Sequence, residues 1–141
     1  MRRSLRGLRK RYGRSESGPC TIPALDSLGE DGLMSFWAVY HRTGPTLAEH
    51  LFGKRFPGFT TVASSMAGYA SNRATAMMCE KRGDASGAAL YNSIAYGIAR
   101  RLPPWVREIT LPAQARDAIL NHVAGEAYRT RRAILKGTGK R

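Results

Sequence analysis

Long apolar stretches are missing from this sequence of 141 residues, and so are closely spaced cysteines. No run approaches the roughly 18–20 apolar residues that a helix needs to cross a bilayer, which argues against a membrane protein. The two cysteines, Cys20 and Cys79, are far apart and do not form the framework that small secreted proteins use. No apolar segment follows the basic start, so no secretory signal is indicated. We therefore expect two free thiols in a reducing compartment.

Acidic residues are absent from both ends of the chain. Residues 1–14 contain seven Lys or Arg and residues 127–141 contain six, without a single Asp or Glu in either segment. The residues between them, 15–126, hold ten basic and ten acidic side chains, so the net charge of +13 comes from these two segments. We call residues 1–14 and 127–141 the basic ends. Because blocks of like charge repel themselves and often serve as interaction tails, a polyanion is the partner that fits them best.

The motifs of common catalytic and metal sites are also missing. The three histidines lack the spacing of metal ligands, and neither cysteine belongs to a C-x₂-C pair. The sequence has no G-x-G-x-x-G motif, no Walker phosphate loop and no serine-hydrolase elbow. Its ten acids are scattered rather than paired for acid–base chemistry. We expect no metal, no cofactor and no enzymatic activity.

Apolar residues recur at helical spacing through the middle of the chain, and no strand-like alternation of useful length occurs. A face made mostly of small residues predicts a helix over 59–82, and a second pattern predicts one over 85–102. Gly83 and Asp84 supply a helix stop and an N-cap in a two-residue joint, so these helices should be antiparallel neighbours. The sequence predicts an all-α fold, a small helical bundle built around this central hairpin.

Shorter patterns flank the hairpin. A short helix is expected from about residue 30 and ends at Gly44 and Pro45, because proline interrupts a helix. A second short helix should stop near Gly53, and a last helix should begin at Pro112, which suits a first helical turn.

These patterns divide the chain into three parts. Residues 1–29 show no sustained period and are expected to form a flexible basic arm, disordered or extended. Residues 30–126 should form the helical domain, and residues 127–141 the basic end of the last helix and a tail.

Arginines provide most of the predicted nucleic-acid contacts, because the guanidinium group suits phosphate oxygens. Trp105 lies in a basic setting and is a candidate for stacking on a base. The predicted contact residues are Arg2, Arg3, Arg6, Arg9, Lys10, Arg11, Arg14, Arg100, Arg101, Arg107, Arg129, Arg131, Arg132 and Lys136.

Three polar side chains interrupt the apolar helices of the hairpin: Asn72, Arg73 and Asn92. A polar group needs a hydrogen-bond partner if it is buried. These residues therefore face solvent, bond to one another across the hairpin, or form a recognition patch.

Several short stretches resemble small, basic proteins of bacteriophages and other bacterial mobile elements for which no activity is established. They are YASNRATAM at 69–77, the Arg82-Gly83-Asp84 turn, the Leu102-Pro103-Pro104-Trp105 ending and RYGRS at 11–15. The resemblance implies the cytoplasm of a bacterial or phage-infected cell and assigns no functional residue. The Arg- and Ser-rich start without acids leaves the mitochondrial matrix as the alternative location.

These features predict a protein that binds DNA or RNA with little sequence selectivity, through arginine-rich arms on a neutral helical scaffold. A helical hairpin also suits a protein-binding accessory factor of a phage or mobile element, an inhibitor or adaptor of a host complex. The third interpretation is a structural component of a virion or ribonucleoprotein, in which the tails neutralise packaged nucleic acid.

Overall fold

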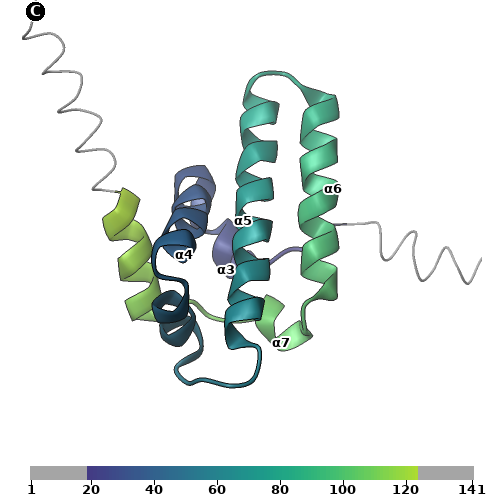
Figure 1. Cartoon of the computed structure of the whole chain (residues 1–141). Coiled ribbons are helices and arrows are strands. Elements are labelled where there is room, and N and C mark those ends of the chain that lie inside the picture. Colours follow the sequence, from purple (N-terminus) through teal and green to yellow (C-terminus); the bar gives the residue numbers. More distant parts are fainter. Residues whose placement is uncertain (1–18, 124–141) are drawn as a thin grey trace, which may run out of the picture.

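Helices joined by short turns make up the part of the chain that the computed structural model describes, residues 19–123. Within this range there is no strand, and no helix is long and apolar enough to cross a membrane. The prediction of an all-α bundle is confirmed. The helices are α3 (Pro23–Asp26), α4 (Gly29–Phe52), α5 (Phe59–Lys81), α6 (Ala85–Arg101), α7 (Pro104–Arg107) and a last helix described over 113–123 (Figure 1).

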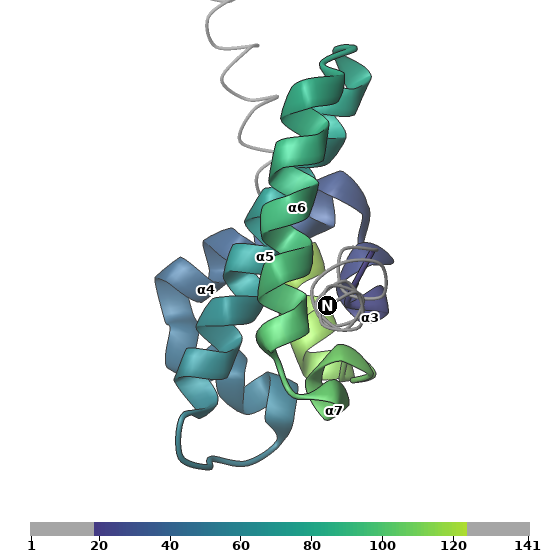
Figure 2. The ribbon, with the colours of Figure 1, turned by 90° about the vertical axis from the view of Figure 1, so that its right-hand side faces the viewer.

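The helices α5 and α6 form the antiparallel hairpin that the sequence predicted, and each ends one residue earlier than expected. They run side by side in Figure 1, and their turn projects beyond the other helices in both views (Figures 1 and 2). Asp84 caps α6, because its Oδ1 accepts a hydrogen bond of 2.9 Å from the backbone N–H of Gly87. Gly83 has a φ of 77°, in the left-handed region that a residue with a Cβ rarely adopts. The helix-stopping glycine and the N-cap that the sequence predicted for this turn are thus both present.

Small residues allow α5 to pack closely on two sides, against α4 and against α6. The buried residues of α5 are mostly alanines, and those of α6 are three alanines. Larger apolar side chains from α4 complete the core, among them Leu33, Phe36 and Leu47. The core therefore lies along the α4 side of the hairpin, and the opposite side of α6 faces solvent.

A kink at Thr43 divides α4, where the sequence predicted two separate helices. Thr43 has non-helical dihedral angles (φ −141°, ψ 51°), and Pro45 follows inside the helix. Proline lacks the N–H that the ladder needs and its ring clashes with the preceding turn, which accounts for the bend. Gly53, with φ 71°, ends α4 where a stop was expected.

The expected flexible arm over residues 1–29 is wrong for its last part. Ile22 and Leu25 are fully buried in the core, and α3, which begins at Pro23, packs against α4 and α5. One helical turn with apolar residues three positions apart is enough to anchor this segment, yet too short to show a sustained period. Residues 1–18 lie outside the described range.

The last helix begins at residue 113, one position after the expected Pro112. It buries Ala115 and Ile119, and His122 Nδ1 lies 3.4 Å from Ser35 Oγ of α4. This helix therefore packs against the bundle. The predicted continuation over 127–141 lies outside the described residues.

Substitution by alanine should have opposite effects on stability at two glycines of the hairpin, Gly68 and Gly87. Replacing glycine by alanine inside a helix ordinarily raises the free energy of unfolding by about 0.5–1 kcal/mol. At Gly68 the new Cβ would lie 3.4 Å from Ile98 Cδ1, an ordinary contact, so Gly68→Ala should be stabilising. At Gly87 it would overlap Asp84 Oδ2 and lie 2.9 Å from Cys79 Sγ, so Gly87→Ala should displace the N-cap. We expect G87A to be about 1–2 kcal/mol less stable than G68A in urea unfolding.

Each of these variants serves as the other's control, because both gain the same helix propensity. An equal gain in stability in both would contradict the arrangement described for the start of α6.

Candidate nucleic-acid interface

A polar network joins α3, α5 and α6, and it is buried at Tyr69 and partly exposed at its other members. The hydroxyl of Tyr69, a fully buried residue, donates to Asp26 Oδ1 at 2.7 Å and accepts from the backbone N–H of Ile22 at 3.1 Å. Arg73 Nε lies 3.4 Å from the same Asp26 oxygen, and Arg73 Nη1 donates to Asn92 Oδ1 at 2.7 Å. Of the interpretations open for Arg73 and Asn92, the bond across the hairpin is the one observed. The network fixes the orientation of Asn92 on α6.

The surroundings of the network raise the pKa values of both Tyr69 and Arg73. Burial and the hydrogen bond to Asp26 raise the pKa of Tyr69 above its usual value, so the phenol stays neutral. Burial tends to lower the pKa of Arg73, but the attraction and the hydrogen bond of Asp26 outweigh it and raise that pKa. The Arg73 guanidinium carbon also lies 5.8 Å from the centre of the Tyr96 ring, within cation–π range. Arg73 therefore carries a fixed positive charge beside Tyr96.

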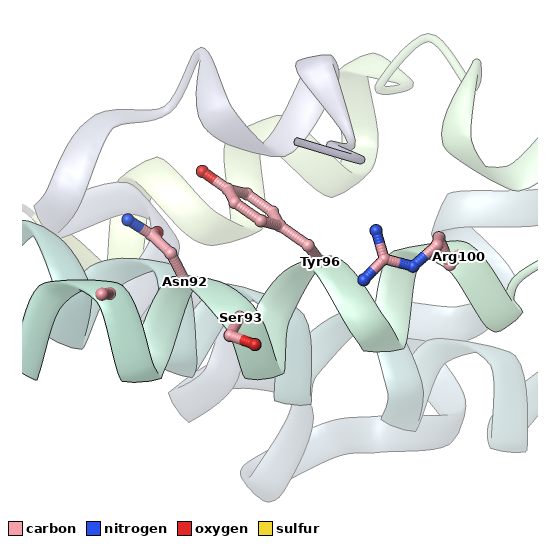
Figure 3. A pocket seen from close by; sticks show the side chains of 5 residues that line it. Asn92, Ser93, Tyr96 and Arg100 are labelled. Atoms are coloured by element: carbon pink, nitrogen blue, oxygen red, sulfur yellow. The ribbon is translucent and has the colours of Figure 1, made fainter. Parts of the chain in front are cut away.

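A shallow pocket of about 330 Å³ lies on α6 next to this network. Asn92, Tyr96 and Arg100 are four residues apart and therefore line one face of the helix. In Figure 3 the Tyr96 ring stands between Asn92 and Arg100, with Ser93 beside them. The full lining consists of Ala89, Asn92, Ser93, Tyr96 and Arg100. Arg100 is the basic residue of this lining, and the other four residues are uncharged.

A second feature is a cluster of aromatic rings at the end of the bundle opposite the hairpin turn, which we call the aromatic end: Phe52, Phe56, Phe59 and Trp105. The Trp105 ring meets Phe52 and Phe56 edge to face, with centroids 5.7 and 5.8 Å away. Trp105 remains 51% exposed. The predicted stacking residue is therefore held in place by packing while half of its surface faces solvent.

Basic side chains accompany the aromatic end. Lys54 and Arg55 precede Phe56 in the turn between α4 and α5, and both are exposed. The Arg55 guanidinium carbon lies 5.6 Å from the centre of the Phe59 ring, and Arg55 Nε pairs with Glu49. Sequence reasoning missed this turn, although the run Lys-Arg-Phe between two glycines carries both charge and an aromatic ring.

The predicted contacts are distributed over several places. Arg100 lines the pocket, and Arg101 is exposed beside it. Arg107 has an internal role instead, because its Nη1 donates to the carbonyl oxygens of Ala99 (3.2 Å) and Leu102 (2.7 Å) at the end of α6. We therefore leave Arg107 out of the interface. The contacts outside the described residues are Arg2, Arg3, Arg6, Arg9, Lys10, Arg11, Arg14, Arg129, Arg131, Arg132 and Lys136.

Metal-ligating side chains do not gather within residues 19–123, where no group of three His, Cys, Asp or Glu is placed to hold an ion. Cys20 and Cys79 are both free thiols. Within residues 19–123, the pocket on α6 and the aromatic end are the candidate features for contact with nucleic acid.

Comparison with protein-family models, with curated proteins and with solved structures finds no match. The resemblance to small basic proteins of phages and mobile elements stays a prediction.

The Tyr69 hydroxyl predicts a selective loss of stability. In Tyr69→Phe, the Ile22 N–H loses a buried acceptor and Asp26 loses a donor, which should lower the free energy of unfolding by about 1–3 kcal/mol. Tyr40→Phe is the matched control, because the Tyr40 hydroxyl makes only a 3.4 Å contact with the Thr60 carbonyl. Urea unfolding of both variants tests this difference, and equal losses would contradict the network.

The raised pKa of Tyr69 also predicts a pH dependence. An unfolded tyrosine loses its proton near pH 10, whereas folded Tyr69 keeps it, so stability should fall as the pH rises above about 10. Y69F should lack this part of the decline. A decline of the same size in Y69F, in urea unfolding across the alkaline range, would show that other groups cause it.

Proposed function

We propose that this protein binds nucleic acid, DNA or RNA, with little sequence selectivity, through its basic ends held on the helical scaffold. The separation of charge carries the proposal: the two basic ends hold the whole net charge of +13, while residues 15–126 are neutral. Cations that neutralise phosphates release the counterions condensed on the strand, which favours binding without reading a sequence. The arginine-rich composition suits such contacts, since guanidinium groups bond phosphate oxygens in pairs.

The positions of the two ends of the described chain support this proposal. The described chain starts beside α6 and finishes on the other side of the bundle, at the end of the last helix (Figure 1). The two ends of the described chain therefore lie at different sides of the bundle. Such an arrangement favours gripping a strand from two positions.

The aromatic end adds a contact of another kind. A half-exposed Trp105 with Lys54 and Arg55 nearby combines a ring for stacking with cations for the backbone, the pairing that single-strand binding surfaces use. Unstacked bases are accessible in single strands, so this surface favours single-stranded over duplex nucleic acid.

Removing charge from a basic end should weaken binding more than removing the same charge from the body. We expect Arg9→Gln, Lys10→Gln and Arg11→Gln combined to lower the affinity for a single strand and to reduce the slope of log K against log salt by about 2–3. Fluorescence anisotropy with a labelled oligonucleotide in a salt series measures both quantities.

The matched control removes three exposed body cations, Arg42, Arg82 and Arg116, in the same way. Its slope should change by less than about 1. Equal losses in the two triple variants would overturn the role of the basic ends. If the unaltered chain does not bind DNA or RNA at low salt, the proposed function is wrong.

Trp105 should contribute to single-strand binding more than the second tryptophan. Stacking of one base is worth about 1–3 kcal/mol, so Trp105→Ala should reduce single-strand affinity by about fivefold or more. Trp37→Ala is the control, because Trp37 is 39% exposed, contacts the His41 ring in a tilted arrangement within α4 and does not belong to the aromatic end. Trp105→Phe should retain part of the affinity, and equal effects of W105A and W37A would remove Trp105 from the interface.

Two exposed apolar residues support a second candidate function, the protein-binding accessory factor. Leu90 and Ile94 are 56% and 41% exposed and lie one helical turn apart on α6. An exposed apolar pair on a helix suits docking into a groove of a partner protein. This function becomes the leading one if nucleic acid does not bind.

A further inference from the structure

We propose that the exposed face of α6 binds the same face of a second copy of this chain, in an antiparallel pair related by a twofold axis. Leu90 and Ile94, the two exposed apolar residues of α6, lie one turn apart on this face. In Figure 1, α5 lies on one side of α6 and no described helix covers the other side. The inference goes beyond the proposed function, and its test needs no nucleic acid.

The middle of α6 carries no charge. Residues 85–99 contain no Asp, Glu, Lys or Arg, although several of them are exposed. A helix at the surface of a globular protein ordinarily carries charged side chains on its outer face, whereas the centres of protein interfaces are depleted of charge. Leu90 and Ile94 lie in the middle of this uncharged stretch. Such a pattern is typical of a face that another protein chain covers.

The two ends of α6 carry charges of opposite sign. Asp84 lies at the N-terminal end and Arg101 at the C-terminal end, and both are exposed. Asp84 Oδ1 accepts from the Gly87 N–H, which leaves Oδ2 to accept from another donor. Arg101 follows Ile94 by seven residues, two helical turns, and therefore lies on the same face. Within residues 19–123, no acidic side chain pairs with Arg101.

The apolar residues and the charged residues fit the same antiparallel register. In a twofold antiparallel pair of helices, positions equally far from the axis on either side lie opposite each other. Leu90 opposite Ile94 of the second copy places the axis at Asn92. Asp84 opposite Arg101 of the second copy places it only half a residue further along. One arrangement therefore buries the apolar residues and pairs the charges, and it does so twice across one axis.

The charges also distinguish a second copy from the basic end at residues 1–14 as the occupant of this face. That segment precedes the described chain, which starts beside α6 (Figure 1). It contains seven Lys or Arg and no acid, so it offers Arg101 no opposite charge. The α6 helix of a second copy offers Asp84 instead. Charge complementarity therefore favours the second copy.

The length of the face limits the strength of the pair. The helix has 17 residues and is about 25 Å long. One helix face of this length gives an interface near the lower limit for specific association, about 1,000 Å² in total. We therefore expect a reversible dimer with a dissociation constant of about 10–100 µM.

Sedimentation velocity of the full-length chain, from about 1 µM to about 500 µM, measures this equilibrium. Leu90→Gln combined with Ile94→Gln should weaken the dimer by about tenfold or more, because two apolar side chains of each copy lose their burial. Leu120→Gln is the matched control, because Leu120 is 44% exposed but lies on the last helix. It should leave the dissociation constant unchanged. A chain that stays monomeric throughout, or equal losses in the two variants, would overturn the α6 interface.

The ion pair can be tested without removing the helix cap. Asp84→Asn keeps an N-cap residue and removes its charge, and Arg101→Gln removes the opposite charge. Each should weaken the dimer by about threefold, and the double variant should lose no more than either alone. Additive losses would show that the two residues do not meet, and would overturn the register.

Two exposed serines of the same face test the antiparallel arrangement. Ser93, which also lines the pocket, lies next to the axis, so Ser93→Cys should form a disulfide with its own copy. Ser86 would lie about 20 Å from its copy, so Ser86→Cys should not cross-link. Cys20 is replaced by serine in both variants, whereas Cys79 is buried and stays.

Mild oxidation followed by non-reducing electrophoresis measures the linked dimer. A disulfide in S93C alone supports the antiparallel pair. Disulfides in both variants would indicate parallel helices and overturn the proposed register. A disulfide in neither variant, in a chain that L90Q and I94Q leave unchanged, would overturn the interface. Binding of nucleic acid is measured separately, so the proposed function can survive each of these results.

Discussion

Close packing of α5 on two sides is the constraint on which the rest of the molecule depends. Alanines at its buried positions let α4 approach from one side and α6 from the other. Larger side chains there would separate the hairpin and expose the core. The same helix carries Tyr69 and Arg73, so the element that holds the bundle together also positions the polar network. Structure and candidate site thus share one scaffold.

The polar network connects the buried core to the surface in short steps. Tyr69 secures Asp26, Asp26 pairs with Arg73, and Arg73 orients Asn92 at the edge of the pocket. Arg73 is largely shielded from solvent and needs such partners, because an unpaired charge would be costly to bury. The pocket therefore inherits its geometry from contacts made inside the molecule. Rigidity of this kind limits the entropy lost when a ligand binds.

Periodicity predicted the long helices of this fold, because α5 and α6 each repeat their apolar face over several turns. The turn at Gly83 and Asp84 could also be predicted from the sequence. Local chemistry alone favours a glycine in the left-handed region and an aspartate at the N-cap. In contrast, α3 is a single turn, and only its packing shows that Ile22 belongs to the core.

The candidate site was less predictable than the fold. Trp105 and Arg100 were identified from local composition, and both lie at surface features of the described body. The role of Arg107 depends on carbonyl groups that approach it only after α6 ends and the chain turns into α7. Lys54 and Arg55 lie near Trp105 only because α4 and α7 meet in the fold. No local sequence pattern indicates this tertiary contact.

The bonds from Arg107 to the end of α6 have a mechanical consequence. Because they tie α7 to the last turn of α6, the backbone that carries Trp105 is held against the end of α6. The half-exposed Trp105 ring is therefore positioned by backbone contacts at the corner between two helices as well as by its own packing.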